Sequence, residues 1–312
     1  MPTAGVPAVS DARPAAAADA VARVRVPATS ANLGPGFDSL GLALALYDEV
    51  ELAVGDGPRC VVEVDGEGAG RVPSDERHLV LRAAHATFDR AGAPRVPLRL
   101  SCRNAIPHSR GLGSSAAAAV AGIAAARALL APTHPLGDDD VLDLAAGFDG
   151  HADNVAACLY GGLVVSWGHE GGWHAAHLTP HPALRPVVFV AERSSSTEAT
   201  RGLLPDRVPH GDAAFTAARA ALAVHALTTD PSLLLPATED RLHQPFRRPA
   251  YPETAALVDA LRADGVAAVV SGAGPTVLAL TVDGRLPDGL DTTGFRVRPM
   301  AVDTTGTRAD TL

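Results

Sequence analysis

The glycine- and serine-rich segment at residues 111–119, Gly-Leu-Gly-Ser-Ser followed by four alanines, constrains the fold of this chain more than any other feature. It follows an apolar, strand-like stretch at 96–102 and opens an alanine-rich stretch with no helix breaker before Pro132. Glycines permit a tight turn and close approach of a ligand, while serines at a helix start add hydroxyls to the free N–H groups there. The pattern predicts a strand, a phosphate-binding loop and a helix, and therefore a nucleotide site.

The predicted loop lacks the basic residue of a Walker A loop. That loop requires Gly-Lys followed by Ser or Thr, and this chain contains no lysine. Backbone amides, serine hydroxyls, arginines and a metal ion must then meet the phosphate charge. One alternative is a buried helix capped by these residues without any ligand. A serine hydrolase is disfavoured because the segment is not Gly-x-Ser-x-Gly and His108 is close only in sequence.

Bulk properties favour a cytoplasmic protein of two domains. The 312 residues suffice for two cores, and a formal net charge of −9 argues against a nucleic-acid partner. Three cysteines without paired spacing indicate reduced thiols rather than disulfides or zinc ligands. The uncharged stretches 111–126 and 154–169 are too short to span a membrane. Residues 1–20, rich in Ala and Pro, are expected to form a disordered leader.

Periodicity and breakers predict strands mixed with helices along the chain. Strands are predicted at 22–27, 42–54, 60–65, 96–102, 163–167, 186–192, 266–270, 276–282 and 295–300. Helices are predicted at 76–91, 114–130, 141–147, 152–159, 197–204, 212–229 and 253–263. The stretch 168–185 is interpreted as a crossing linker with an edge strand. This order indicates an α+β protein of two layered domains, which we place at 21–168 and 169–312.

Two further glycine-bearing loops make the nucleotide interpretation specific. One is 27–41, Pro-Ala-Thr-Ser-Ala-Asn-Leu-Gly-Pro-Gly-Phe-Asp-Ser-Leu-Gly, and the other is 271–276, Ser-Gly-Ala-Gly-Pro-Thr. With 111–119 they resemble, in order, the three motifs of the galactokinase, homoserine kinase, mevalonate kinase and phosphomevalonate kinase (GHMP) superfamily. The resemblance spans residues 27–280. It implies a ribosomal-protein-S5-like N-terminal domain, a ferredoxin-like C-terminal domain and an active site between them.

The same resemblance implies which residues hold ATP and Mg²⁺. The second motif of the family binds the nucleotide, and here it comprises Pro107, His108, Ser109, Arg110, Gly111, Leu112, Gly113, Ser114, Ser115, Ala116 and Ala117. The family holds magnesium with a serine of this loop and an acidic residue eleven positions before an asparagine of the substrate segment. In this chain those residues are Ser114, Asp143 and Asn154, and all three are expected to be catalytic.

Three segments resemble the homoserine kinases in particular. Residues 149–157, Asp-Gly-His-Ala-Asp-Asn-Val-Ala-Ala, resemble that family's Glu-Gly-His-Pro-Asp-Asn-x-Ala stretch. Residues 196–205 and 244–247 resemble its Ser-Thr-x-x-Ala-Arg-x-x-Leu-Pro and Glu-Pro-Tyr-Arg stretches. The implied substrate-binding residues are Asn32, Asp38, His151, Asn154, Thr197, Arg201, Arg247 and Gly272. Taken alone, the His-Asp-Asn group is equally typical of a helix cap, and each arginine of a solvated surface charge.

The resemblance implies ATP-dependent phosphorylation of L-homoserine to O-phospho-L-homoserine, for threonine biosynthesis. Two arginines suit a small amino acid, because planar guanidinium groups bind carboxylates bidentately. Asn154 is no base, so the implied route positions the hydroxyl without a carboxylate. Departures at His78, Ala152, Gln244 and Phe246 leave open another small hydroxy acid or hydroxy-amino acid. A non-catalytic ligand-binding relative is a further alternative; no nucleic-acid or membrane partner is expected, and a homodimer is left open.

Overall fold

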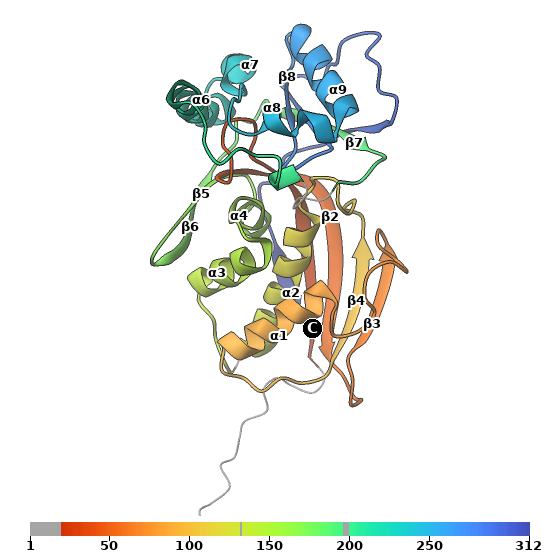
Figure 1. Cartoon of the computed structure of the whole chain (residues 1–312). Helices are drawn as coiled ribbons and strands as arrows, with labels where there is room; N and C mark the ends of the chain where they lie inside the picture. Colours follow the sequence, from red (N-terminus) through yellow and green to blue (C-terminus); the bar gives the residue numbers. More distant parts are fainter. Residues whose placement is uncertain (1–19, 132, 196–199) are drawn as a thin grey trace, which may run out of the picture.

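Two sheets with helices packed on them form the described part of this computed structural model, residues 20–131, 133–195 and 200–312 (Figure 1). The mixed α+β architecture predicted from the sequence is confirmed. The expected leader lies outside the described residues apart from Ala20, and the first part of the helix expected at 197–204 also lies outside them.

The larger sheet has seven strands. Its main path runs β11-β1-β2-β4-β3, with β5 pairing β2 and β6 pairing β5. All its pairs are antiparallel except β3 with β4. The strands are β1 (Val21–Ala31), β2 (Leu40–Val54), β3 (Val61–Gly66), β4 (Leu98–Asn104), β5 (Leu163–His169), β6 (Gly172–Leu178) and β11 (Arg308–Thr311).

Four helices lie on one face of this sheet (Figure 1). They are α1 (Leu79–Arg90), α2 (Ser114–Leu130), α3 (Asp138–Asp149) and α4 (Asp153–Tyr160). The alanine-rich α2 packs against α1, α3, α4 and the sheet, and its small side chains let these neighbours approach closely. Most of α2 is buried, as expected for a helix that is apolar on nearly all sides.

The smaller sheet has four strands in the order β10-β7-β9-β8. These are β7 (Arg185–Ala191), β8 (Ala267–Val270), β9 (Val277–Thr281) and β10 (Phe295–Pro299). The helices of this part are α6 (His210–Thr228), α7 (Leu234–Ala237), α8 (Gln244–Arg247) and α9 (Pro252–Ala263), with 3-10 turns at Pro231–Leu233 and Arg248–Ala250. Strands β8 and β9 are buried throughout, although β8 lies at the edge of the sheet, and this burial explains their unbroken apolar sequence.

The boundary placed at residue 168 does not coincide with the division between the two sheets. The hairpin strand β6 and the C-terminal strand β11 both pair within the larger sheet. Strand β11 is fully exposed along Arg308–Thr311, so its sequence lacks the apolar alternation from which a strand is predicted. Among the described residues, no helix has the length and apolar character needed to cross a membrane.

Gly122 lies at a close approach of α1 and α2. A Cβ at this position would overlap the carbonyl oxygen of Val80, whereas a Cβ at Gly147 in α3 would meet nothing within 4 Å. We expect Gly122→Ala to destabilise the protein by about 1–3 kcal/mol through overpacking. The matched Gly147→Ala change should instead stabilise it by about 0.5–1 kcal/mol, because alanine favours a helix. Urea denaturation of both variants measures this; equal effects would contradict the close packing.

Candidate active site

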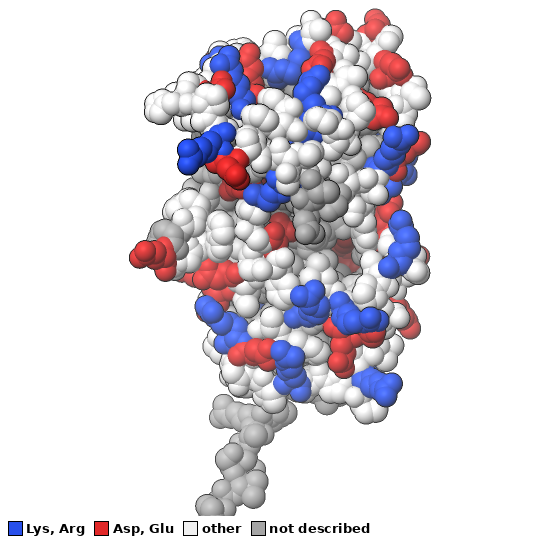
Figure 2. All heavy atoms as spheres, in the orientation of Figure 1, with Lys and Arg blue, Asp and Glu red and all other residues white. Residues whose placement is uncertain are grey.

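A cavity of about 630 Å³ lies where the N-terminal layer meets the C-terminal part of the chain. Its walls come from residues between 26 and 154 and from residues between 195 and 273. Figure 2 shows a hollow in the middle of one face, with arginine and acidic side chains interspersed on the surface around it. The cavity therefore joins segments that are far apart in sequence.

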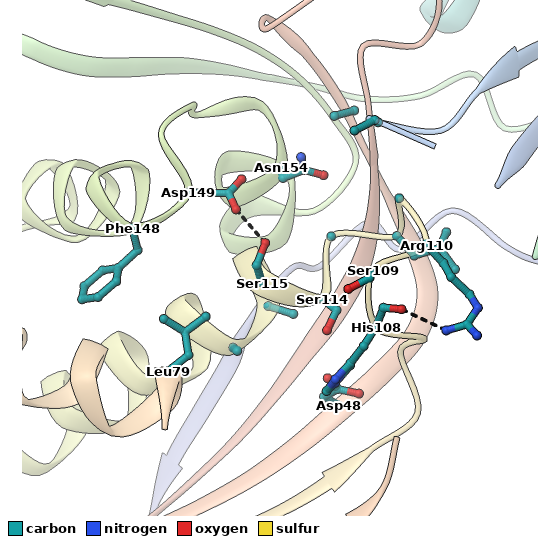
Figure 3. A pocket seen from close by; sticks show the side chains of 18 of the residues that line it. Asp48, Leu79, His108, Ser109, Arg110, Ser114, Ser115, Phe148, Asp149 and Asn154 are labelled. Carbon is teal, nitrogen blue, oxygen red and sulfur yellow. Dashed lines mark hydrogen bonds between the residues drawn. The ribbon is translucent and has the colours of Figure 1, made fainter. Parts of the chain in front are cut away.

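The glycine loop and the start of α2 form the middle of this cavity (Figure 3). Gly111 and Gly113 have φ values of 74° and 69°, in the left-handed region that favours glycine. Gly113 is also the N-cap of α2, where no side chain of the described residues caps the first helical N–H groups. These donors, at the positive end of the helix dipole, are therefore free to bind an anion.

Backbone and side-chain hydrogen bonds hold the three glycine-bearing loops together. The Thr29 N–H donates to the Leu112 carbonyl at 3.1 Å, and the Gly272 N–H donates to the Ala31 carbonyl at 3.2 Å. The Ser271 hydroxyl lies within hydrogen-bond distance of the Gly111 carbonyl. A Cβ on Gly111 would overlap the Ser271 carbonyl oxygen. The loops at 27–41, 111–119 and 271–276 thus meet at one place, as their sequence pattern predicts.

Arg110 lines the cavity, but its guanidinium is engaged with the protein backbone. It donates to the carbonyls of Ala191 at 2.7 Å, His108 at 2.9 Å and Glu192 at 2.9 Å. These bonds fasten the phosphate loop to the end of β7. The side chain therefore holds the loop in place instead of offering its charge to a phosphate.

The carboxylate next to the start of α2 is Asp149, not Asp143. Its Oδ1 accepts a hydrogen bond from the Ser115 hydroxyl at 2.8 Å, beside Ser114 (Figure 3). Burial raises the pKa of Asp149, and the Ser115 bond opposes that shift. Asp143 lies elsewhere: its Oδ1 accepts from the Trp173 N–H at 2.7 Å, at the turn between β5 and β6. The prediction that Asp143 reaches the site as a metal ligand does not fit this geometry.

Asn154 lies at the start of α4 and faces the glycine loop. The Thr29 hydroxyl donates to its Oδ1 at 2.8 Å, which fixes the orientation of the amide. The neighbouring Asp153 accepts the Asn154 N–H at 2.7 Å and is only 3% exposed. Burial raises the pKa of Asp153 to about 7, and the nearby carboxylates Asp149 and Asp38 add to the shift.

Side chains of opposite charge meet at one end of the cavity, beside the loop at 27–41. The Arg201 guanidinium binds Asp38 bidentately, with N···O distances of 2.8 and 3.1 Å. The Nε2 atom of His151 lies 3.5 Å from the same carboxylate. Asn32 supports the loop: its Oδ1 accepts the Asp38 N–H at 3.0 Å and its amide donates to the Gly272 carbonyl at 2.9 Å.

Arg247 is the second cation at this end, and it is only 1% exposed. Its Nη1 atom lies 3.3 Å from Nδ1 of His243. Its Cζ atom lies 5.3 Å from the centre of the Phe37 ring, as does the Cζ atom of Arg201. Phe37 also stacks on His243, with ring centres 4.9 Å apart. One aromatic ring therefore contacts both guanidinium groups.

The opposite end of the cavity is apolar with a few buried polar groups. Val72, Leu79 and Phe148 line it together with His78 and Asp48. Asp48 accepts two backbone N–H groups at 2.7 and 2.9 Å, and burial raises its pKa to about 6. Burial lowers the pKa of His78, whose Nδ1 atom has no hydrogen-bond partner among the described residues. Such walls suit a flat, partly polar ring.

Most of the residues predicted from the sequence line this cavity: Asn32, Asp38, His108, Ser109, Arg110, Gly111, Leu112, Gly113, Ser114, Ser115, Ala117, His151, Asn154, Arg201, Arg247 and Gly272. Pro107 and Ala116 are buried beside the loop without lining it. Thr197 lies outside the described residues.

Four residues that shape the site were not predicted. Thr29, Phe37 and Asp149 lie inside segments whose motifs were recognised, and His243 directly precedes another. The sequence carried one signal for Asp149, which is the glycine that follows it. Gly150 ends the helix in a left-handed conformation, so Asp149 is the last residue of α3. The roles of the other three depend on contacts across 100 residues or more, or on ring stacking, which spacing does not reveal.

Comparison with known sequences places this cavity in a family. The profile for the GHMP kinases N terminal domain matches residues 78–162, and that for the GHMP kinases C terminal matches residues 219–288. A homoserine kinase of Streptomyces avermitilis is 56% identical over 262 residues, which cover 84% of this chain and 86% of that protein. One of Rhodococcus erythropolis is 53% identical over 269 residues, covering 83% and 85%.

Solved structures agree with the sequence comparison. The crystal structure of homoserine kinase from Cytophaga hutchinsonii has a TM-score of 0.80 at 26% identity, covering 93% of this chain and 97% of that one. A putative homoserine kinase from Listeria monocytogenes has a TM-score of 0.72 at 30% identity, covering 93% and 99%.

The buried Asp153 should make stability depend on pH in a specific direction. An unfolded aspartate has a pKa near 3.9, so between about pH 4 and 7 the native protein holds a proton that the unfolded chain has released. The unfolding free energy contributed by this group therefore falls as pH rises through that window. Asp153→Asn removes the titration but keeps an oxygen that accepts the Asn154 N–H.

We expect the stability of Asp153→Asn relative to the unsubstituted protein to increase by at least about 1.4 kcal/mol, the value of one pKa unit, between pH 4.5 and 8. Urea denaturation at the two pH values measures it. A stability difference that stays constant with pH would show that Asp153 is ionised normally.

Proposed function

The chain belongs to the GHMP kinase family and, within it, to the homoserine kinases, and we propose that its cavity transfers the γ-phosphoryl group of ATP to the side-chain hydroxyl of L-homoserine. The product is O-phospho-L-homoserine, for threonine biosynthesis. One observation carries this proposal, namely the order of three regions along one cavity. An apolar pocket is followed by the start of α2 and then by paired side chains of opposite charge.

ATP matches the first two of these regions. Its base suits the end lined by Val72, Leu79 and Phe148, where His78 offers a buried ring nitrogen. Its phosphates suit the uncapped N–H groups at the start of α2. The Ser114 hydroxyl lies at the same place, whereas the Ser115 hydroxyl donates to Asp149.

L-Homoserine matches the charged end. We assign its carboxylate to Arg201 and Arg247 and its ammonium group to Asp38 and the amide of Asn32. A zwitterion supplies both charges at once, so it can take over the Asp38–Arg201 pair without leaving either group unpaired in a partly buried site. His151, Thr197 and Gly272 remain predicted contacts of this substrate.

Asn154 serves the reaction by positioning rather than by proton abstraction. An amide does not accept a proton near neutral pH, and the Thr29 bond holds its Oδ1 in place. Phosphoryl transfer passes through a loose transition state in which alignment and charge neutralisation supply most of the catalysis. We therefore assign Asn154 the task of holding the substrate hydroxyl in line with the γ-phosphate.

Mg²⁺ would be held by the Ser114 hydroxyl and the Asp149 carboxylate. Oxygen donors of this kind are the ones that magnesium prefers. The fit is supported by Asp149 itself, since it is partly buried, accepts a hydroxyl hydrogen bond and has no cationic side chain within ion-pair distance among the described residues. When bound, the ion would neutralise charge on the phosphate oxygens.

Three of the four departures from the family pattern lie outside the cavity walls. Ala152 is fully buried, and Gln244 turns its Oε1 toward the Val270 N–H at 2.8 Å. Neither residue lines the cavity, nor does Phe246, whereas His78 does. This favours homoserine over another small hydroxy-amino acid, which the same charged end would otherwise accept. A non-catalytic relative is disfavoured because the cavity is fully assembled around Asn154.

The cysteines bear on the cellular compartment of this protein. We propose a cytoplasmic enzyme, on the grounds that Cys60, Cys102 and Cys158 are all free thiols. A homodimer, like the lack of a nucleic-acid or membrane partner, stays a prediction from the sequence.

Substitution of either arginine should weaken selection of the substrate carboxylate. We expect Arg201→Ala and Arg247→Ala each to lower kcat/KM for L-homoserine by an amount equivalent to about 1.5–3 kcal/mol, as for a charged hydrogen bond. Lysine should restore little, because a point charge cannot reproduce the guanidinium fork. The measurement is steady-state kinetics with a coupled ADP assay.

Homoserine amide provides the control for this experiment. An arginine that binds the carboxylate matters far less for a substrate that lacks it, so the loss should shrink on the amide. The same loss on both substrates would assign the arginine to ATP binding or to folding instead.

The two aspartates of α3 offer a matched test of the metal assignment. Asp149→Asn should lower kcat by about 10²–10³-fold, on the scale of losing one preorganised electrostatic group, and should change nucleotide binding less. Asp143→Asn should leave kcat within about threefold, because an amide oxygen still accepts the Trp173 N–H. Titration of kcat with magnesium separates the two variants. The reverse ranking would restore Asp143 to the site.

A further inference from the structure

Arg247 is a buried cation without a carboxylate partner. It is 1% exposed, and among the described residues no acidic side chain lies within ion-pair distance of it. Burial lowers its pKa, although a guanidinium stays protonated in proteins. Its Nε atom also has no hydrogen-bond partner. Something other than an ion pair must therefore hold this charge in place.

Among the described residues, the side chain within hydrogen-bond distance of the Arg247 guanidinium is that of His243. Its Nδ1 atom lies 3.3 Å from Nη1 of Arg247. A guanidinium has only donors, so this contact is a hydrogen bond only where Nδ1 carries a lone pair. The tautomer of His243 thus decides whether it attracts or repels the arginine.

The other nitrogen of the ring settles that tautomer. Nε2 of His243 lies 2.8 Å from the carbonyl oxygen of Gly34 and 3.4 Å from Oδ2 of Asp240. Both neighbours are acceptors, so the proton belongs on Nε2 and Nδ1 is left free to accept. The side chains of His243 and Asp240 are both fully buried, which excludes competition from water.

Asp240 is itself fixed, so the arrangement is rigid. Its oxygens accept the backbone N–H groups of Leu242 at 2.7 Å, Gln244 at 2.8 Å and His243 at 3.2 Å. The first turn before α8 therefore holds the carboxylate, the carboxylate and Gly34 fix the imidazole, and the imidazole meets the arginine.

We propose that His243 is a positioning residue, held as its Nε2–H tautomer, that sets the orientation in which Arg247 binds the substrate carboxylate. This inference rests on the proposed function of Arg247. The charged groups facing the ring are Asp240 from its own segment, Arg247 from α8 and Asp38 from the first loop, with the neutral Phe37 ring stacked on it. Burial lowers the pKa of His243, which keeps the ring neutral beside the arginine.

Two variants separate the Nδ1 contact from the rest of the side chain. His243→Phe keeps a ring that can stack on Phe37 but loses both hydrogen bonds. His243→Asn loses the bond to Gly34 as well, yet its amide oxygen can take the place of Nδ1. Both variants lack the Nε2 contact, and the Asn variant also lacks the ring that stacks on Phe37, so tighter substrate binding by the Asn variant than by the Phe variant reports the contact with Arg247.

We expect His243→Phe to raise KM for L-homoserine about tenfold or more, the scale of a lost hydrogen bond to a charged group. The KM for ATP should stay within about twofold and kcat within about threefold, since binding of the carboxylate is unchanged between ground and transition state. His243→Asn should keep KM for L-homoserine within about threefold of the unsubstituted enzyme. Thermal unfolding of both variants checks that each is folded under assay conditions.

A double-mutant cycle with Arg247→Ala decides whether the effect passes through the arginine. In that background His243→Phe should add no further rise in KM, because the contact is already lost. Equal KM values for the Phe and Asn variants, or an undiminished effect of His243→Phe in the Arg247→Ala background, would overturn the inference and leave His243 a structural residue.

The tautomer itself is measured without any substrate. The imidazole ¹⁵N spectrum of the ligand-free protein at pH 7.5 should show a protonated Nε2 and an unprotonated Nδ1 at His243, and the opposite tautomer would overturn the inference whatever the enzyme phosphorylates. Lack of L-homoserine turnover by the unsubstituted enzyme would instead overturn the proposed function, so the two failures are distinguishable.

Discussion

The rest of the site depends on the free N–H groups at the start of α2. A helix start is usually satisfied by a side chain at the N-cap, but here that position is Gly113, which has none. The donors remain available because the left-handed conformation of Gly113 turns the loop away from them, and because Gly111 lets the loop at 271–276 pack directly against its backbone. The fold thus leaves backbone donors free at a helix start, where the proposed phosphate site of a chain without lysine would use them.

The arginine side chains are distributed unevenly along the cavity. Arg110 lies at the glycine loop of 111–119, where three of its five N–H donors bind backbone carbonyls. The guanidinium groups of Arg201 and Arg247 lie at the far end instead, beside Asp38. Phosphate charge must then be met by amides, hydroxyls and the proposed metal ion beside Asp149, while side-chain charge is kept for the amino acid. The two substrates are distinguished by which kind of donor each meets.

Local patterns in the sequence predicted the loops and helices well, because each loop carries its own glycines and each helix its own breakers. The choice of Asp143 rested on counting eleven residues back from Asn154, and counting does not say which way a side chain points. Asp143 and Asp149 are six residues apart on α3, which is about 9 Å along the axis and roughly two-thirds of a turn around it. The second aspartate faces the start of α2, while the first faces Trp173 at the start of β6 in the β5–β6 hairpin. Strand β11 was missed for a related reason, since its pairing with β1 joins the two ends of the chain.

The two arginines at the substrate end explain why a carboxylate would bind there strongly. Arg201 and Arg247 lie at the same distance from the Phe37 ring, and the charge of Arg201 contributes to lowering the pKa of Arg247. Bringing like charges together in a buried place costs free energy, which the negative face of the ring and Asp38 offset only in part. A substrate carboxylate placed between the guanidinium groups would remove that repulsion as well as accept their hydrogen bonds. A neutral analogue would leave the repulsion between the two guanidinium groups in place. The site would therefore select a ligand by its negative charge as well as by its shape.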